Sequence, residues 1–312
     1  MSITTLAEPA PGAAAGRGAA DTRSHAFTHA RVMLRRNLKH LRRYPSLTLM
    51  VTLMPLVFLL LFVYVFGGTL GSGLGGGMPA GMHGGRSAYA DYVAPAIILM
   101  AVAAAAQGTA IAVAQDMTEG VIARFRTMAV ARSAVLTGHV VGATVQTLIG
   151  VVVVTLAALC VGFRPHAGPA GWLAALGVVL LLTLAVTWLC VGLGLSAKSV
   201  ETASNSPMFL ILLPFLGSGF VPTASLPAGL RWFAEYEPFT PVNETLRGLL
   251  TGTRIGDNLV ITLAWCVGTA VLSYAWSRRL YEREPKPMIW PEAMEAITEP
   301  RRKSSRAWTL LR

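Results

Sequence analysis

The histidines and cysteines of this chain are the residues most able to do chemistry, but their spacing is typical of neither a catalytic site nor a metal site. Six histidines, at positions 25, 29, 40, 83, 139 and 166, lack the spacing of metal ligands. The three cysteines, Cys160, Cys190 and Cys266, lie singly in apolar runs and form no CxxC pair. This favours their interpretation as small apolar residues of helices rather than as a redox site. No HExxH or GxSxG motif occurs. We therefore expect neither a metal site nor a catalytic site.

One segment resembles a phosphate-binding loop. It reads Gly192-Leu-Gly-Leu-Ser-Ala-Lys198-Ser199, with Ala197 where the motif needs glycine. It also follows an apolar helical run, whereas a phosphate loop follows a strand. We predict that it binds no nucleotide, so the chain either is passive or draws energy from another subunit.

The composition is that of a membrane protein. Apolar residues make up 54% of the 312 residues and charged residues 13%, against about 25% charged in soluble domains. The net charge of +11 is concentrated at the two ends, which favours a membrane surface over nucleic acid as the partner. Met1 to Arg43 has no early apolar stretch, so no cleavable signal peptide is expected.

Charge-free runs predict an all-α, polytopic fold with six transmembrane helices. A bilayer core of about 30 Å needs about 20 apolar residues as helix, and the runs do not alternate as β-barrel strands would. The glycine-rich stretch 67–85 belongs in a loop. The predicted spans are 47–66, 92–114, 140–162, 172–195, 208–222 and 259–277.

The fifth predicted span differs from the others because prolines interrupt it. Pro207, Pro214, Pro222 and Pro227 punctuate it, and residues 231–253 then mix aromatic with charged side chains. That mixture predicts an interfacial or re-entrant segment; an ordinary extramembrane loop is the alternative. No predicted span contains Asp, Glu, Lys or Arg in its interior, which argues against a proton-coupled pump.

Basic residues predict the orientation. With six spans, 21 of the 26 Lys and Arg residues fall on the side of both termini and five on the opposite side. The positive-inside rule then places both termini in the cytoplasm, and we expect a multi-pass protein of the inner membrane.

Two segments on that side could act as helices outside the membrane. The approach to the first span has apolar and basic faces and predicts an amphipathic helix on anionic lipid, or else a plain basic flank. Its basic residues are Arg31, Arg35, Arg36, Lys39, Arg42 and Arg43. The loop 116–132 carries a short apolar stripe, which indicates either a partner or packing on its own helix ends.

Together these segments resemble the permease subunits of ABC-2 type exporters, in the daunorubicin-exporter-like branch. The resemblance covers roughly residues 30–280. The residues that carry it, in chain order, are Arg42-Arg-Tyr-Pro45 with the run from Met54 to Gly68, Glu119-Gly120 with Arg124-Phe-Arg126, Glu201-Thr-Ala-Ser-Asn-Ser-Pro207, Phe220-Val-Pro-Thr223, Leu226-Pro227, Pro238-Phe-Thr-Pro241 and Arg247-Gly-Leu-Leu-Thr-Gly252.

The resemblance implies partners and roles. It implies a second permease copy or paralogue and two cytoplasmic ABC ATPase subunits, which would hold ATP and Mg. It makes the N-terminal amphipathic segment an elbow helix and implies re-entrant extracellular helices after the fifth span. An ATPase-coupling helix would contain Glu119, Gly120, Arg124, Phe125 and Arg126, and the broken-helix motif would contain Glu201, Asn205, Pro207, Pro214, Pro222 and Pro227.

The resulting prediction is a non-enzymatic permease of an ATP-driven exporter for hydrophobic or amphipathic compounds. We expect a disordered cytoplasmic tail over 1–29, a transmembrane domain over 30–280 and a cytoplasmic tail over 281–312. Export of a polysaccharide or lipid-linked glycan is one alternative, and a passive channel or membrane scaffold is another. Membrane lipid and the substrate complete the expected partners, without nucleic acid.

Overall fold

The computed structural model describes residues 45–69, 85–118 and 132–282, and these ranges contain helices and loops but no strand. The elements in order are α2 (Pro45–Leu60), the π-helix η1 (Leu61–Phe66), α4 (Gly85–Thr118), α6 (Arg132–Val161), α7 (Pro169–Ser196), α8 (Val200–Asn205), α9 (Met208–Leu216), the 3-10 turn η2 (Thr223–Ser225), α10 (Ala228–Tyr236), α11 (Phe239–Thr251) and α12 (Asn258–Glu282). A helix forms hydrogen bonds between its own backbone N–H and C=O groups, for which lipid provides no partner.

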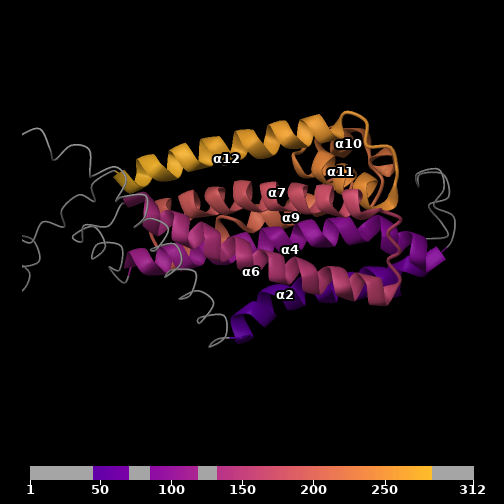
Figure 1. Cartoon of the computed structure of the whole chain (residues 1–312), viewed down its shortest axis with the longest axis horizontal. Helices are drawn as coiled ribbons and strands as arrows, with labels where there is room; N and C mark the ends of the chain where they lie inside the picture. Colours follow the sequence, from indigo (N-terminus) through magenta and orange to yellow (C-terminus); the bar gives the residue numbers. More distant parts are fainter. Residues whose placement is uncertain (1–44, 70–84, 119–131, 283–312) are drawn as a thin grey trace, which may run out of the picture.

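Helix α4 is the centre of the bundle (Figure 1). It contacts α2, α6, α7, α8, α9 and α11, whereas α12 packs mainly on α7. Residues 88–103 of α4 are buried apart from Asp91, which is partly exposed. Many of them are alanines, whose small side chains let neighbouring helices approach closely.

Five of the predicted spans coincide with long apolar helices. Within the described residues, five segments are long and apolar enough to cross a membrane: Thr52–Thr69, Gly85–Thr118, Leu136–Val161, Pro169–Ser196 and Asn258–Tyr281. The predicted class, an all-α polytopic membrane protein, is therefore confirmed.

The fifth predicted span, 208–222, is a broken helix, as its prolines predicted, but its helical part has other bounds, with α8 at Val200–Asn205 and α9 at Met208–Leu216. The chain forms the short helices α8 and α9, and residues 217–222 after Leu216 are not α-helical. Pro207 stands between the two helices, where its missing N–H interrupts the ladder. Contacts from Gln107 to Ser204 and from Tyr89 to Phe220 show this segment following α4 for about 27 Å at 1.5 Å per residue.

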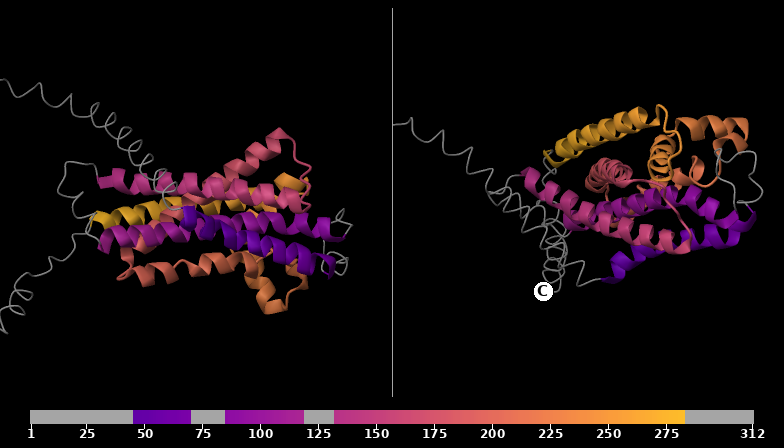
Figure 2. Two further views of the ribbon diagram at one scale, coloured as in Figure 1. Left: turned by 90° about the horizontal axis from the view of Figure 1, so that it is seen from below. Right: turned by 45° about the vertical axis from the view of Figure 1, so that its right-hand side comes forward.

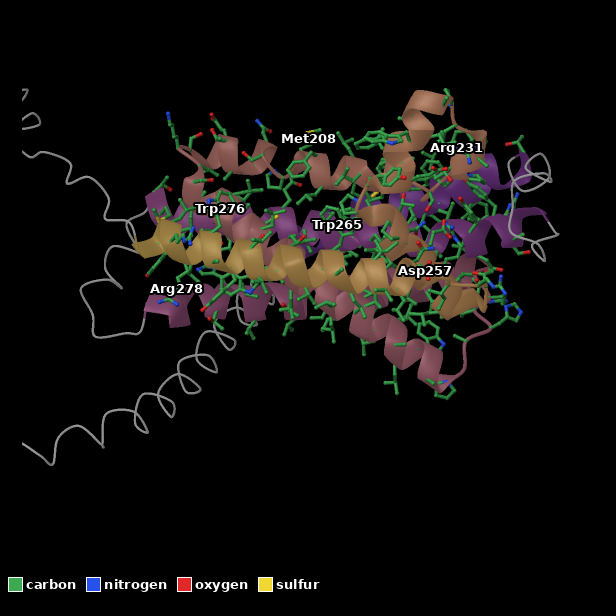
Figure 3. All side chains as sticks on the ribbon, turned by 90° about the horizontal axis from the view of Figure 1, so that it is seen from above. Met208, Arg231, Asp257, Trp265, Trp276 and Arg278 are labelled. Carbon is green, nitrogen blue, oxygen red and sulfur yellow. The ribbon has the colours of Figure 1, made fainter. Side chains whose placement is uncertain are left out.

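The two ends of the bundle differ. One end, here called the hairpin end, gathers α10, α11 and the starts of α4 and α12, and Figure 3 places Arg231 and Asp257 there. Trp276 and Arg278 lie toward the opposite end, where α4 and α7 finish. In Figure 2 α10 projects from the bundle at the hairpin end, while α8 and α9 lie along its side.

The segment that resembles a phosphate loop serves packing and capping. A Cβ on Gly192 would lie 2.5 Å from the Trp276 ring, and one on Gly194 would lie 2.6 Å from the Ala110 carbonyl oxygen. Both glycines therefore allow α7 to approach its neighbours closely. Ser199 accepts a hydrogen bond from the Thr202 N–H and caps α8.

Two predicted segments lie outside the described residues. These are the amphipathic segment with Arg31, Arg35, Arg36, Lys39, Arg42 and Arg43, and the loop with Glu119, Gly120, Arg124, Phe125 and Arg126. The predictions for both segments stand as they were made.

Candidate functional site

The clearest polar constellation surrounds the backbone just after α9. The carbonyl oxygen of Ser218 accepts hydrogen bonds from the Tyr92 hydroxyl at 3.0 Å, the Asn243 amide at 3.1 Å and the Arg247 guanidinium at 2.9 Å. Ser218 is only 3% exposed. Because a buried carbonyl needs a donor, these bonds fix the chain after α9 to both α4 and α11.

Arg247 is the charged centre of this constellation. Its side chain is 1% exposed, and its guanidinium lies 3.8 Å from the centroid of the Tyr92 ring. Besides Ser218, it donates to the Tyr92 carbonyl at 3.1 Å and to Glu244 Oε1 at 2.7 Å. A guanidinium presents several donors in a rigid plane, which suits a site with three separate acceptors.

Helix α11 brings these side chains to the bundle. Gly252 ends the helix at φ +78°, a left-handed conformation that glycine adopts readily. Thr245 lies 3.1 Å from Thr262 of α12, oxygen to oxygen, so α11 is also joined to the last span. The amides of His166 and Ala167 donate to the Leu250 carbonyl, which ties the loop after α6 to the end of α11.

Glu237 is the second buried charge, at the junction of α10 and α11. It is 4% exposed, its Oε1 accepts from Thr240 Oγ1 at 3.2 Å, and its Oε2 has no hydrogen-bond partner. A Cβ on Gly217 would collide with this carboxyl group and with Thr240 Oγ1, so a larger residue there would displace both side chains. Burial raises the pKa of Glu237 to about 8, although the Thr240 bond opposes that shift.

Helix α10 presents aromatic side chains outward. Trp232 is 67% exposed and Tyr236 is 69% exposed, with ring centroids 5.5 Å apart. Arg231 and Glu235 form an exposed ion pair at 2.7 Å beside them. Aromatic and charged residues together are typical of a helix at a membrane–water boundary.

Phenylalanines form a seam between the first span and the broken one. Phe220 packs with its ring centroid 4.3 Å from Phe62 and 4.5 Å from Phe215. Phe58 meets Phe215 edge-on at 5.3 Å. The neighbouring faces of α2, η1 and α9 expose large apolar side chains: Leu53, Met54, Val57, Tyr64, Met208, Phe209 and Leu212.

The opposite end has a simpler contact. His139 Nε2 lies 3.0 Å from Asp116 Oδ2, joining α4 to α6 just before the two helices reach the loop 119–131. This contact joins the two helices that flank the predicted coupling segment.

The structure separates the predicted broken-helix residues into two groups. Pro207 before α9, Pro214 inside α9 and Pro222 before η2 are buried, whereas Pro227 is exposed at the start of α10. Glu201 and Asn205 are exposed on α8. The constellation around Ser218 begins two residues after the end of α9 and is built from other residues, of α4 and α11.

The sequence reasoning missed Arg247 and Glu237 as buried charges. It assigned both to an interfacial or re-entrant segment, but the structure buries Arg247 against Tyr92 and Ser218, and Glu237 against Gly217 and Thr240. One signal was present: Glu244 and Arg247 stand three residues apart in a helix otherwise rich in apolar side chains, a spacing that allows them to pair.

Comparison with known proteins identifies what this bundle resembles. Residues 28–251 match the model of the ABC-2 type transporter family. The chain is also 24% identical over 197 residues to the Daunorubicin resistance ABC transporter permease protein DrrB1 of Streptomyces coeruleorubidus, covering 63% of this chain and 70% of that protein.

Proposed function

Because the chain belongs to the ABC-2 type transporter family, we propose that it is the permease subunit of an ATP-driven exporter for hydrophobic or amphipathic compounds. Such compounds would be drugs, polyketides or lipids. The family match over 28–251, on a bundle of long apolar helices, is the observation that carries the proposal. The drug-resistance permease among its relatives supports export as the direction and a drug-like cargo as the class.

The surface beside the broken span suits apolar cargo. Large apolar side chains are exposed on α2, η1 and α9, the elements that carry the phenylalanine seam. A compound that dissolves in the bilayer could reach this surface from the side without leaving an apolar environment. The same faces offer a contact for a second permease copy or a paralogue.

Energy would come from two cytoplasmic ATPase subunits that hold ATP and Mg. In this proposal both termini and the loop 119–131 face the cytoplasm of a cell with the chain in its inner membrane. The elbow residues 31–43 would lie on anionic lipid, and Glu119, Gly120, Arg124, Phe125 and Arg126 would dock on the ATPase. The short contact between Asp116 and His139 would carry movement of that loop into α4 and α6.

Transport would then follow a change in helix tilt. ATP-driven closure of the paired ATPases would displace the coupling loops, and α4 would transmit the displacement because it contacts α2, α6, α7, α8, α9 and α11. The break at Pro207 gives the fifth span a point at which its two halves could change angle.

The docking role of the loop 119–131 can be tested by charge reversal. We expect Glu119→Arg, or reversal of Arg124 and Arg126 together, to abolish ATPase copurification and efflux while leaving membrane insertion unchanged. Lys198→Glu, on the same side but outside the loop, is the matched control and should keep both. Normal copurification and efflux in the Glu119 and Arg124/Arg126 variants would remove the docking assignment.

A further inference from the structure

Glu237 stands out because it is a buried acid without a cation. Its carboxyl group is packed against Gly217 and bonded only to Thr240, and one oxygen is left without a donor. Thr240 Oγ1 also accepts from the Ser218 N–H at 3.1 Å, so Glu237 and the end of α9 share one hydroxyl group. The carboxyl group thus lies at the contact between the α10–α11 hairpin and the broken span.

The ionisable groups on the surrounding elements are engaged elsewhere. On α11, Arg247 pairs with Glu244. On α10, Arg231 pairs with Glu235, and Tyr236 projects outward beside Trp232. The elements α9 and η2 carry no ionisable residue.

Helix α4 contributes four further groups near this end. The Tyr89 and Tyr92 hydroxyls donate to the Phe220 and Ser218 carbonyls. Asp91 accepts from the Arg164 amide, and the Arg86 guanidinium lies 5.1 Å from the centroid of the Tyr64 ring. Among the described residues, therefore, no ion pair reaches Glu237.

We propose that Glu237 is a proton-binding site, at which a bound proton keeps the α10–α11 hairpin packed on the end of α9 and proton release opens it. A neutral carboxyl group tolerates this pocket, whereas an unpaired carboxylate there would be strongly disfavoured. The orphaned Oε2 would carry the proton. The proposal requires the observed fold but neither the ATPase nor a particular cargo.

The direction of the pH effect follows from linkage. The closed hairpin holds its proton up to a pKa of about 8, whereas in an open, hydrated hairpin Glu237 would titrate near its ordinary 4.5. As pH rises between these values, the open form loses its proton first and is favoured increasingly. The ratio of open to closed forms should rise up to about tenfold per pH unit in that window and level off above it.

Infrared difference spectroscopy on the full chain in lipid vesicles tests proton binding directly. A protonated carboxyl group has a C=O stretch that a carboxylate lacks. We expect a band in the wild type that disappears on raising the pH through about 8, is missing in Glu237→Gln, and persists in the control Glu235→Gln. A spectrum that Glu237→Gln leaves unchanged would overturn the proposal.

Hydrogen–deuterium exchange tests the opening, with labelling times scaled to the intrinsic rate at each pH. Amides of residues 217–244 should exchange faster as pH rises in the wild type and in Glu235→Gln. In Glu237→Gln they should stay protected, because the amide is neutral and nearly the same shape as the protonated acid. The mechanism would be contradicted if the exchange of these amides depended on pH equally in Glu237→Gln and the wild type. It would also be contradicted if exchange in the wild type did not depend on pH.

Discussion

The apolar bundle and the hairpin end are held together by different means. Where α7 meets α4 and α12, packing relies mainly on small residues such as Gly192 and Gly194 and on the ring pair of Trp188 with Tyr274 at 4.9 Å, with a hydrogen bond from Ser277 to the Trp188 carbonyl. At the hairpin end, charged and polar side chains converge on a single backbone carbonyl, that of Ser218.

This difference bears on movement. Apolar helix contacts lack directional bonds, so helices can tilt or slide against each other at small cost. A buried hydrogen-bonded network is stable only when its bonds are formed, because a buried polar group without a partner raises the free energy strongly. Intermediate geometries are therefore disfavoured. We therefore expect the bundle to carry gradual motion and the hairpin end to switch between discrete arrangements.

The largest effect should come from removing the charge at the hairpin end. Arg247→Met takes the guanidinium from Ser218, Tyr92 and Glu244 at once. We expect a loss of about 3–5 kcal/mol in stability, because breaking a buried pair leaves its partner uncompensated. Thermal unfolding of the purified chain in detergent would measure this loss.

Arg231→Met is the control for that experiment. Arg231 is paired with Glu235 on the same end of the molecule, but its side chain is 51% exposed. We expect a change of no more than about 1 kcal/mol, as for surface ion pairs in general. If Arg247→Met and Arg231→Met lost the same stability, the burial of Arg247 would not be what stabilises the hairpin end.

A smaller effect should follow from crowding the apolar bundle. A Cβ on Gly194 would lie 2.6 Å from the Ala110 carbonyl oxygen and 3.1 Å from Val113 Cβ. Gly194→Ala should therefore push α7 from α4 and cost about 1–3 kcal/mol. Gly177→Ala on the same helix meets nothing within 4 Å, so it should be neutral or stabilising by up to about 1 kcal/mol. Thermal unfolding would measure both changes in stability. If Gly194→Ala and Gly177→Ala both destabilised the chain, or both stabilised it, the packing argument for Gly194 would be wrong.

The smallest effect should come from the polar contact inside the bundle. Gln107 donates to the Ser204 carbonyl at 2.6 Å, next to the break at Pro207. Gln107→Leu should cost about 0.6 kcal/mol, and no more than about 1.7 kcal/mol, which are the average and the maximum for hydrogen bonds between membrane helices. Gln115→Leu, an exposed position on the same helix, should change stability less. If Gln107→Leu matched Arg247→Met in cost, the distinction between the two regions would fail.

Hydropathy sufficed to predict five spans because each is a local property of about 20 residues. For the segment 208–222 the prolines predicted the break, but hydropathy did not predict where helix α9 ends, because residues 217–220 bond to distant helices instead of continuing it. The family resemblance, drawn from motif order, was confirmed by the match over 28–251.

Sequence alone could not place the buried charges. Arg247 bonds to Tyr92, which lies 155 residues earlier, and no periodicity in α11 encodes that pairing. Glu237 presents the same difficulty, since its burial depends on Gly217 and Thr240 meeting at one point. The coupling and elbow segments lie outside the described residues and stay predictions.

In the proposed function, this permease moves apolar compounds only when an ATPase drives it. ATP-dependent accumulation of a fluorescent hydrophobic compound in inverted membrane vesicles, with the chain coexpressed with an ABC ATPase that copurifies with it, tests this coupling. We predict accumulation with ATP and none with a non-hydrolysable analogue. Equal accumulation with and without ATP hydrolysis would contradict the account and identify a passive channel.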